Sequence, residues 1–555
     1  MRIPKSSEKL LEFVIDKVRE CTYSQATRAR DAANNLAYYE NGGLGNRPSL
    51  YNRTGVHIDR LSSYLYAPGE VRYSIGFDAT DGEPWLTRAK LASKYLSREY
   101  RRADGDVVFA QGVETALIKN CSLLKHNWDS DDALSPGFNP MLVHPEFFGV
   151  EREDMQRLED QQAFVHTYYL SKNQIYDLIE GRDDKAELRK AIKKLGGGDV
   201  ETKQNWLHQV VLGGLTPVAQ NSPSGATGQA SISPSSMTQF SPDMMQDLLR
   251  VDELWVVNSE QRDYNTIQLL EGLYLLEGKY RLRNLTGIKG FQPFSKICPD
   301  PVSGYFWGRS EVARVIPLQD MLSQRMRDVQ RLLKLQVRAP KALIGFTGVN
   351  AQKFRAATAP GGMLQSDNPN ASIKDMAPTL PQEVFREIAV IESMFDEVGG
   401  FKPILQGEGE PGVRSSSHAK QLMRTASPKL RSRALVVERD VETSAGLTFE
   451  LLQAKDARVF EGEETKESFY LKQMPEDLYV EVDSHSSSPV FTEDAQNLAF
   501  GMKKLNIIDG DDALLLIHPP LMELLLSNSK KRAAARQKFL ADHPDIANKA
   551  AKKGG

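Results

Sequence analysis

The sequence predicts an α+β protein that is mainly helical and is built from several modules. Three observations support this fold class. Helix-periodic stretches fill much of the N-terminal third, and short alternating, strand-like segments lie between and after them. Later in the chain, two long helical stretches bracket a small segment rich in Gly, Pro and Asn. The length of 555 residues exceeds what one hydrophobic core usually supports.

Composition and charge are those of an ordinary folded protein. Apolar residues make up 40% of the chain, charged residues make up 26%, and the formal net charge is −3. Affinity for nucleic acid would therefore need local segregation of charge. The three cysteines, Cys21, Cys121 and Cys298, have neither disulfide nor metal-ligand spacing, which suits a reducing cytosol. No signal peptide or membrane span is recognised, so we expect a soluble, intracellular protein without membrane contact.

The first half of the chain combines amphipathic helices with short strands. Five apolar residues share one face of the first helix: Leu10, Leu11, Val14, Ile15 and Val18. Ser24 is expected to cap the next helix, and further helices are predicted over 85–102 and 107–125. Strands are predicted at 71–77, 138–150, 163–170 and 253–258, followed by a meander at 265–284. The Ser- and Pro-rich residues 216–246 predict a flexible insertion within one α+β module.

The two long helices carry opposite charge. The first is predicted to run to Arg338, with Pro317 in its first turn or at a kink. Its basic stripe consists of Arg327, Arg331, Lys334 and Arg338, and its apolar face of Leu318, Leu322, Val329, Leu332 and Leu333. The second starts behind Pro381 and stops at Gly399 and Gly400; its acidic residues are Glu383, Glu387, Glu392, Asp396 and Glu397, against Arg386. The helices could pair as a hairpin or across neighbouring subunits, or could present two ordinary solvated faces.

A Gly-rich loop follows the second helix, in the stretch "FKPILQGEGEPGVRSSSHAKQ" at 401–421. Gly407, Gly409 and Gly412 match the spacing of a dinucleotide-binding fingerprint. A dinucleotide loop needs a preceding strand and a βαβ unit, but Pro403 interrupts the would-be strand and no βαβ pattern surrounds it. Glu408 and its neighbour Glu410 would also place two carboxylates beside a pyrophosphate. The match is therefore interpreted as accidental, which excludes a dehydrogenase.

The segment after this loop is the most strongly basic part of the chain. No Asp or Glu occurs from Pro411 to Val437. Such a segment suits contact with a phosphate backbone, although ion pairing with the acidic helix upstream is an alternative. Ser427 is expected to cap a helical segment whose first residue is Pro428, giving a kinked rod.

Catalytic motifs are absent from the sequence. It contains neither a G-x-x-x-x-G-K-[ST] loop nor an H-E-x-x-H helix, and no nucleophile, base and orienting group can be assembled. The acidic clusters at 129–132 and 509–512 lack the spacing of an EF-hand and are interpreted as turns or helix N-termini. We therefore expect no catalytic residue, cofactor site or metal site, and a protein that is not an enzyme.

Several stretches together resemble the portal proteins of tailed bacteriophages, which form the ring at a capsid vertex through which DNA passes. "HPEFFGV" at 144–150 resembles the segment that closes a wing strand. The stretch 299–333 resembles the entry into the first stem helix; its matching residues are Gly308, Ser310, Pro317 and Gln319. The order helix, small subdomain, helix, Gly-rich loop, basic helix resembles stem, clip, stem, tunnel loop and wing helix. The resemblance covers most of the chain and rests on this order, whereas 216–246 and the last hundred residues depart from the family pattern.

This resemblance implies a portal-like architecture with a β-containing wing, long stem helices, a small α/β clip and a helical C-terminal crown. The implied divisions are a wing at 1–309, stem helices at 310–340 and 381–398 around a clip at 341–380, a tunnel loop at 399–415, a kinked wing helix at 416–455 and a C-terminal region and crown at 456–555. Other head or neck structural proteins and enzymes that process nucleic acid are the alternatives. The former are generally shorter and lack the bracketed helix pair, and the latter should show catalytic motifs.

The resemblance also implies partners and site residues. The partners are further copies of the chain in a ring of about twelve, as in the family, double-stranded DNA bound without sequence specificity, the terminase large subunit, neck or adaptor proteins, and capsid and scaffolding proteins. The implied location is the capsid vertex of a virion assembled in the host cytoplasm. The implied DNA-facing loop residues are Gly399, Gly400, Phe401, Lys402, Gln406, Glu408, Glu410 and Arg414. The implied basic wing-helix residues are Lys420, Arg424, Lys429, Arg431 and Arg433. The implied clip docking residues are Lys341, Phe346, Lys353 and Arg355.

Overall fold

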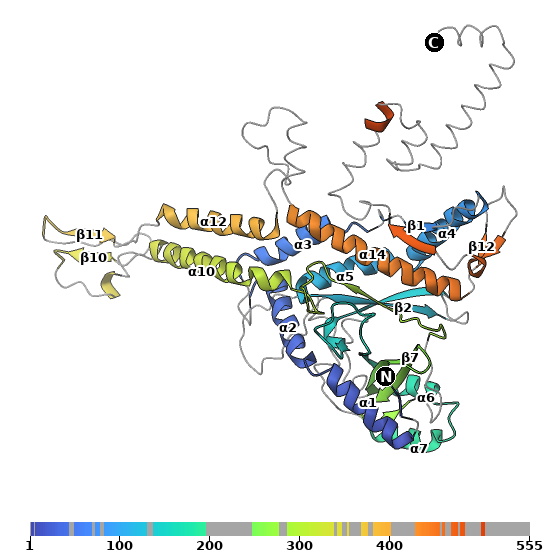
Figure 1. Ribbon diagram of the computed structural model, residues 1–555. Coiled ribbons are helices and arrows are strands. Elements are labelled where there is room, and N and C mark those ends of the chain that lie inside the picture. The colour runs from blue at the N-terminus through green and yellow to red at the C-terminus, as the bar shows by residue number, and fades with distance from the viewer. Residues whose placement is uncertain are drawn as a thin grey trace, which may run out of the picture. The chain divides into compact units, whose positions relative to one another are not determined.

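The chain is mixed helix and sheet, as Figure 1 shows for the computed structural model. The structure describes residues 2–4, 6–43, 49–68, 71, 73–77, 83–129, 137–195, 247–276, 286–337, 341–346, 352–354, 368–375, 381–400, 428–455, 458–460, 468–474, 478–482 and 501–504. The chain divides into two units. The first consists of Met1–Ser62, Gly112–Lys125 and Leu142–Ser432, and the second of Ser63–Gln111, His126–Met141 and Arg433–Gly555. The predicted insertion at 216–246 lies outside the described residues.

A five-stranded antiparallel sheet with the order β4-β5-β6-β7-β8 forms the centre of the first unit. Its strands are β4 (Phe148–Val150), β5 (Ala163–Ser171), β6 (Leu248–Asn258), β7 (Asp263–Leu270) and β8 (Tyr274–Leu275). These strands are rich in β-branched and aromatic residues, which suit a pleated and half-buried surface. In the register, Phe164 lies opposite Trp255, which in turn lies opposite Thr266. The strands predicted at 163–170 and 253–258 are confirmed.

Alternation along the strands gives this sheet two apolar faces. Helix α1 (Ser7–Cys21) covers one face with Leu10, Val14 and Val18, so the predicted helix face is confirmed. The sheet residues beneath it are Ala163, Val165, Leu254, Val256, Ile267 and Leu269. Helices α6 (Lys172–Leu178) and α7 (Lys185–Lys194) pack on the strand residues Leu249, Val251 and Leu270.

The predicted helix at 107–125 ends earlier than expected. Helix α5 (Gly105–Lys119) stops at Lys119, and Asn120 has a φ of 108°, a conformation that Asn tolerates better than most residues. The following residues form β2 (Ser122–Asp129), whose first four residues pair with β9 (Phe294–Ile297). β2 also lies beside β3 (Gly137–Val143). The prediction was wrong for 122–125 because pairing with a distant strand decides their conformation.

Ser24 does precede α2 (Gln25–Asn41), but its side chain does not cap the helix. The hydroxyl of Ser24 donates to Glu153 and accepts from Arg28 instead. Glu153 also accepts from Arg28 at 2.7 Å and from the Trp307 indole at 2.8 Å, and the Arg28 guanidinium lies 3.8 Å from the centre of the Trp307 ring. Burial is the largest influence on the pKa of Arg28 and lowers it. The segment before the first long helix is thus held against α2.

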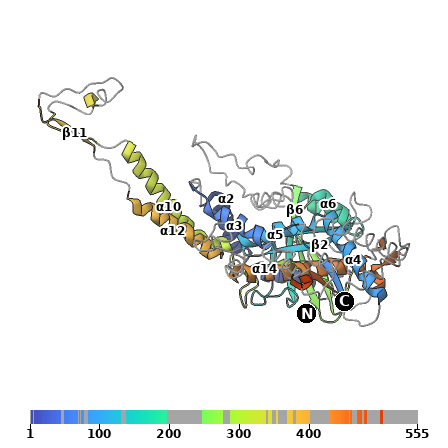
Figure 2. The same cartoon turned by 90° about the horizontal axis from the view of Figure 1, so that it is seen from above.

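The two long helices form an antiparallel hairpin with a small sheet at its tip. Helix α10 (Glu311–Val337) leads to β10 (Lys341–Ile344), which pairs with β11 (Ser372–Asp375), and α12 (Gln382–Gly399) returns. In both views α10 and α12 lie side by side (Figures 1 and 2), and Figure 1 shows β10 and β11 beyond the end of α10 and the start of α12. Pro317 lies inside α10 rather than in its first turn, where it removes the N–H that would otherwise bond to the carbonyl of Ala313.

The second unit is organised around polar groups buried among aromatic rings. Its elements include β1 (Tyr73–Phe77), which pairs with β14 (Leu478–Val482), α4 (Glu83–Arg102), β12 (Arg458–Phe460), β13 (Ser468–Tyr470) and most of α14 (Pro428–Ala454). The Tyr100 hydroxyl lies 3.0 Å from that of Thr448, which also contacts His126 Nδ1 at 2.9 Å. Burial lowers the pKa of His126 to about 3. Within the implied C-terminal region and crown at 456–555, the described residues 458–482 include three strands. Most residues beyond 482, where the helical crown is implied, lie outside the described part.

Candidate functional site

The hairpin is the candidate site, and an apolar seam holds its two helices together. Val315 and Leu322 of α10 pack against Ile391 and Phe395 of α12, and all four side chains are at most 1% exposed. Farther out, Arg325 Nε donates to Glu387 Oε1 at 2.9 Å, which raises the pKa of Arg325. The opposite charges of the two helices therefore do meet within one chain, but through Arg325, which lies outside the predicted basic stripe.

Gln319 joins the base of α10 to α3 (Arg53–Leu65). Its side chain is fully buried, and its Oε1 accepts from the backbone N–H groups of Arg53 and Thr54 at 3.0 and 3.1 Å. Its Nε2 donates to the Tyr51 carbonyl at 3.0 Å and contacts the hydroxyls of Ser49 and Ser323. The first N–H groups of a helix have no partner within the helix. Gln319 therefore caps α3 from a helix that is distant in sequence.

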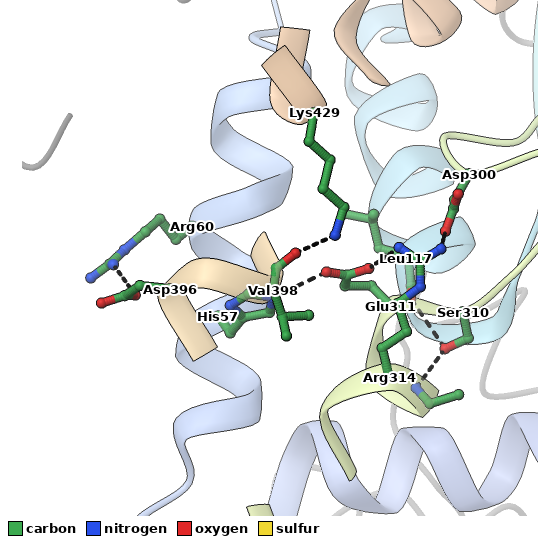
Figure 3. A network of polar contacts seen from close by, with 11 residues as sticks. His57, Arg60, Leu117, Asp300, Ser310, Glu311, Arg314, Asp396, Val398 and Lys429 are labelled. Carbon is green, nitrogen blue, oxygen red and sulfur yellow. Dashed lines mark hydrogen bonds and ion pairs between the residues drawn. The ribbon is translucent and has the colours of Figure 1, made fainter. Parts of the chain in front are cut away.

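Asp396 joins the base of α12 to α3. One carboxylate oxygen, Oδ1, lies 3.0 Å from Arg53 and 3.2 Å from Arg60. Figure 3 draws the contact with Arg60. The side chains of Arg53, Arg60 and Asp396 are 14%, 27% and 25% exposed, so solvent screens the group only in part. Two arginines on one helix thus hold the acidic helix at its base.

The start of α10 is fixed by a second polar cluster (Figure 3). Ser310 accepts from the Ala313 N–H at 3.2 Å, which makes it the N-cap, and its hydroxyl donates to the Ile118 carbonyl at 2.6 Å. Glu311 is 1% exposed; its carboxylate contacts His57 Nε2 at 3.4 Å and Arg314 at 3.2 Å. Arg314 also pairs with Asp300. A carboxylate in the first turn is favoured by the helix dipole, so this position suits Glu311.

We expect Asp396→Ala to loosen the base of α12. Removing the carboxylate leaves Arg53 and Arg60 partly buried without their shared partner, which should cost about 1 to 3 kcal/mol. Hydrogen exchange of the α12 amides should become faster, and the thermal unfolding temperature should fall. Glu392→Ala, one helical turn earlier, is the matched control, because no described cation lies within ion-pair distance of Glu392. Equal effects of the two substitutions would contradict this role for Asp396.

The predicted basic stripe lies on the solvent-exposed side of α10. Arg327, Arg331 and Lys334 are exposed, and Arg327 Nε donates to the Ser323 carbonyl at 3.0 Å. Arg338 lies outside the described residues. Among the described residues, α12 contributes no ion pair to Arg327, Arg331 or Lys334. The stripe is therefore available for contact with another molecule.

The helix stop at the end of α12 is confirmed. Gly400 has a φ of +80°, and its N–H bonds to the Glu397 carbonyl at 3.1 Å. Lys429, at the start of α14, donates to the carbonyl of Val398 (Figure 3). A side chain added at Gly400 would lie 3.6 Å from Lys429 Cβ. The chain thus leaves α12 and enters α14 at neighbouring points.

The residues predicted for the loop and the basic segment are only partly described. Gly399 is the buried last residue of α12. The predicted residues outside the described part are Phe401, Lys402, Gln406, Glu408, Glu410, Arg414, Lys420 and Arg424. Pro428 is the first residue of α14, as predicted, and Lys429 and Arg431 are exposed. Arg433 is 5% exposed, so it cannot belong to an exposed basic surface in this chain; it falls on the face of α14 that also buries Leu430, Ala434 and Val437.

Three of the four predicted docking residues are described, and they belong to the segment between α10 and α12 at the tip of the hairpin. Lys341 is the first residue of β10 and pairs with Asp375 of β11 in the backbone register. Phe346 is half-buried and Lys353 is exposed, whereas Arg355 lies outside the described residues. Two large apolar side chains of the strands, Ile344 and Ile373, are 50% and 46% exposed. The tip therefore presents both apolar and charged groups.

Sequence reasoning missed the residues that hold the base of the hairpin. Arg53, His57 and Arg60 recur at i, i+4 and i+7, which places them on one face of α3. That spacing can be recognised in the sequence and indicates a shared helix face, but it does not identify partners more than two hundred residues away. Asp396 was counted only as one charge of an acidic helix.

Neither a metal site nor a membrane span is found among the described residues. No group of three or more His, Cys, Asp or Glu side chains there is arranged to hold a metal ion. The described helices include none that is long and apolar enough to cross a bilayer.

Comparison with solved structures gives likenesses of low sequence identity. No protein-family model matches the chain. No curated protein matches it in sequence. A chain from the virion of a native gene transfer agent particle has a TM-score of 0.38 and 8% identity, over 88% of this chain and 93% of that chain. A chain from the neck of an empty gene transfer agent particle has a TM-score of 0.41 and 9% identity, over 88% and 94%. Likenesses at this level carry no argument about function.

Proposed function

We propose that this chain is the subunit of a portal ring of a tailed bacteriophage or a related particle. In this proposal, copies of the chain surround a channel at one capsid vertex, through which double-stranded DNA is packaged and ejected. The hairpin tip docks the terminase motor first and neck proteins later. The role is structural, and no catalytic reaction is assigned to the chain.

One observation carries the proposal: the arrangement of α10, β10, β11 and α12 in the first unit, which also contains the start of α14. Two long antiparallel helices carry a small β tip, and the chain then passes through residues 401–427 into a further long helix. The segment 401–427 begins and ends at neighbouring points, as the Lys429–Val398 contact shows. Residues 401–427 thus connect two neighbouring points, and in this proposal they form the loop that faces the channel.

The distribution of charge suits a channel that lets DNA slide. A channel lined throughout by Lys and Arg would bind DNA tightly, because each neutralised phosphate adds to affinity through counterion release. Here the net charge is −3, and the long helices carry charge of both signs. Such a surface favours weak contacts along the duplex that let the DNA move through the channel.

Negative-stain microscopy of the purified full-length protein tests this proposal directly. We expect end-on views of a ring with a central hole, formed by several copies. A monodisperse single-copy particle without a hole, at all concentrations and salt conditions tried, would rule the portal assignment out.

Deleting residues 402–412 should leave ring assembly intact but impair packaging or retention of DNA. The reason is that this stretch connects the end of α12 to the start of α14, whereas the described seam of the hairpin is formed by α10 and α12 themselves. Ring formation is checked by microscopy, and packaging by the amount of nuclease-protected DNA in particles. Normal packaging by a ring of the deletion variant would contradict the assignment of this stretch to the channel.

A further inference from the structure

Two of the three cysteines lie opposite each other just beyond the ladder between β2 and β9. The antiparallel register pairs Ser122 of β2 with Ile297 of β9 at one end of this ladder. One position farther, Cys121 therefore falls opposite Cys298. Both cysteines belong to the first unit and are buried, with exposed fractions of 0% and 3%. Strand pairing thus brings together two thiols that are far apart in the sequence.

The backbone hydrogen bonding shows which type of cross-strand pair this is. In an antiparallel ladder, hydrogen-bonded pairs alternate with pairs that lack mutual backbone hydrogen bonds, and the Cα atoms of the latter lie about 4.5 Å apart. The N–H of Cys121 donates to Asn120 Oδ1 at 2.8 Å and not to the neighbouring strand. Cys121 and Cys298 therefore match the second type. A separation of about 4.5 Å lies within the range of roughly 4.4 to 6.8 Å that a disulfide spans between Cα atoms.

The two side chains also lie on the same side of the strands, as directly opposite residues do. Cys298 Sγ lies 3.9 Å from the carbonyl oxygen of Asn120, the residue just before Cys121. Burial is the largest influence on the pKa of Cys121 and raises it, and negative charge on Cys298 raises it further. The two thiols are therefore close enough to influence each other. Cys21, by contrast, belongs to the core between α1 and the five-stranded sheet.

This pair of cysteines lies where the chain approaches the hairpin. Cys121 follows the end of α5, and Cys298 belongs to the segment that leads from β9 into α10. The N-cap of α10, Ser310, already contacts α5 through the hydrogen bond from its hydroxyl to the Ile118 carbonyl, at 2.6 Å. A covalent bond between the cysteines would add a second and stronger link between α5 and the start of α10.

We propose that Cys121 and Cys298 form a cross-strand disulfide when the protein meets an oxidising mixture of small thiols and disulfides, and that this bond fixes the start of α10 on α5. In the structure both cysteines are present as thiols. A reducing cytosol would keep them in that state. The inference does not depend on the proposed ring, because both cysteines belong to one chain.

Oxidised glutathione can serve as the oxidant. Cys298, the more exposed of the two, attacks one glutathione sulfur as a thiolate, so that a mixed disulfide forms and one glutathione thiolate leaves. The thiolate of Cys121 then attacks Cys298 Sγ, and the second glutathione thiolate leaves. The two cysteines lose two electrons and two protons, and two molecules of reduced glutathione take them up. Because burial disfavours the thiolate, we expect the reaction to be slow in the folded protein and faster during refolding.

Thiol counting and peptide mapping test whether the bond forms. The full-length protein is incubated in its folded form, and separately refolded, in reduced and oxidised glutathione at several ratios, and remaining thiols are then alkylated in denaturant. At oxidising ratios we expect the number of alkylated cysteines to fall from three to one, because two are joined and Cys21 is not. Mass spectrometry of an unreduced digest should find the Cys121 peptide linked to the Cys298 peptide.

The effect of the bond is measured by comparing the oxidised and reduced forms of each chain. In the unaltered chain, oxidation should raise the unfolding temperature by about 3 °C or more, because a crosslink that closes a long loop constrains the unfolded chain. Hydrogen exchange in the first turn of α10 should become slower. Cys121→Ala and Cys298→Ala should each abolish both effects of oxidation. Cys21→Ala, the matched control at the third buried cysteine, should keep them.

Three results would overturn the inference. The first is an unchanged number of thiols in both the incubated and the refolded protein. The second is oxidation that yields only glutathione adducts, or a bond to Cys21, without the linked peptides of Cys121 and Cys298. The third is a Cys121–Cys298 bond that leaves exchange at the start of α10 unchanged, which would show that the bond does not fix this helix. None of these results bears on ring formation, which microscopy tests separately.

Discussion

Gln319→Leu should strongly destabilise the first unit. Leucine fills a similar volume but leaves the N–H groups of Arg53 and Thr54 without their described partner. It also removes one of the two described donors to the Tyr51 carbonyl, which keeps the Ser49 hydroxyl. Each buried polar group that loses its partner costs about 1 to 3 kcal/mol, so the total loss should reach about 3 kcal/mol or more. We expect the unfolding temperature of the first unit to fall by about 5 °C or more, measured by calorimetry.

Hydrogen exchange distinguishes a lost cap from general damage. The amides in the first turn of α3 should lose protection first, because Gln319 binds two of them directly. Gln324→Leu is the control: it makes the same chemical change on the same helix, at an exposed position. If Gln324→Leu were as destabilising as Gln319→Leu, capping of α3 would not be the reason.

The sequence predicted the helices and strands of the first unit well wherever local periodicity dominates. The apolar face of α1, the strands β5 and β6, and the long helices α10 and α12 all follow from spacing alone. Prediction was wrong where a distant partner overrides the local pattern. Residues 122–125 continue an apolar run that is typical of a helix, yet they pair with β9, which is more than 160 positions away. Ser24 has the chemistry of a cap, but Glu153 and Arg28 take its hydroxyl.

The candidate site was predictable as an arrangement but not as a set of contacts. Opposite charge on two bracketing helices predicted that they could pair, and the hairpin confirms this. The bridging residue Arg325 was not singled out, because spacing gives the stripe on a helix and not the direction in which that stripe faces. Arg433 is buried although it lies in the most basic segment of the chain, since net charge along a sequence does not tell which helix face is covered. Partners of α3 such as Gln319 and Asp396 depend on tertiary contacts that no local pattern encodes.

Gly308→Ala should destabilise the first unit at least as strongly as the loss of Gln319. Gly308 has a φ of +70°, which costs other residues about 1 to 2 kcal/mol. An added Cβ would also lie 2.4 Å from Cys298 Sγ, 3.0 Å from the Asp300 carbonyl oxygen and 3.1 Å from that of Asn120. Cys298 is 3% exposed, so its sulfur has little room to move, and the two carbonyls belong to the backbone.

Gly304→Ala separates backbone strain from this clash. Gly304 has nearly the same φ, +69°, but nothing lies within 4 Å of an added Cβ. Gly304→Ala should therefore cost about 1 kcal/mol, and Gly308→Ala about 3 kcal/mol or more, because overpacking adds to the strain. Calorimetry of the two variants measures the difference, and faster hydrogen exchange at β9 should appear only in Gly308→Ala. Equal unfolding temperatures would show that the segment from Cys298 to Gly308 can shift to make room, and that this close approach does not fix the entry into α10.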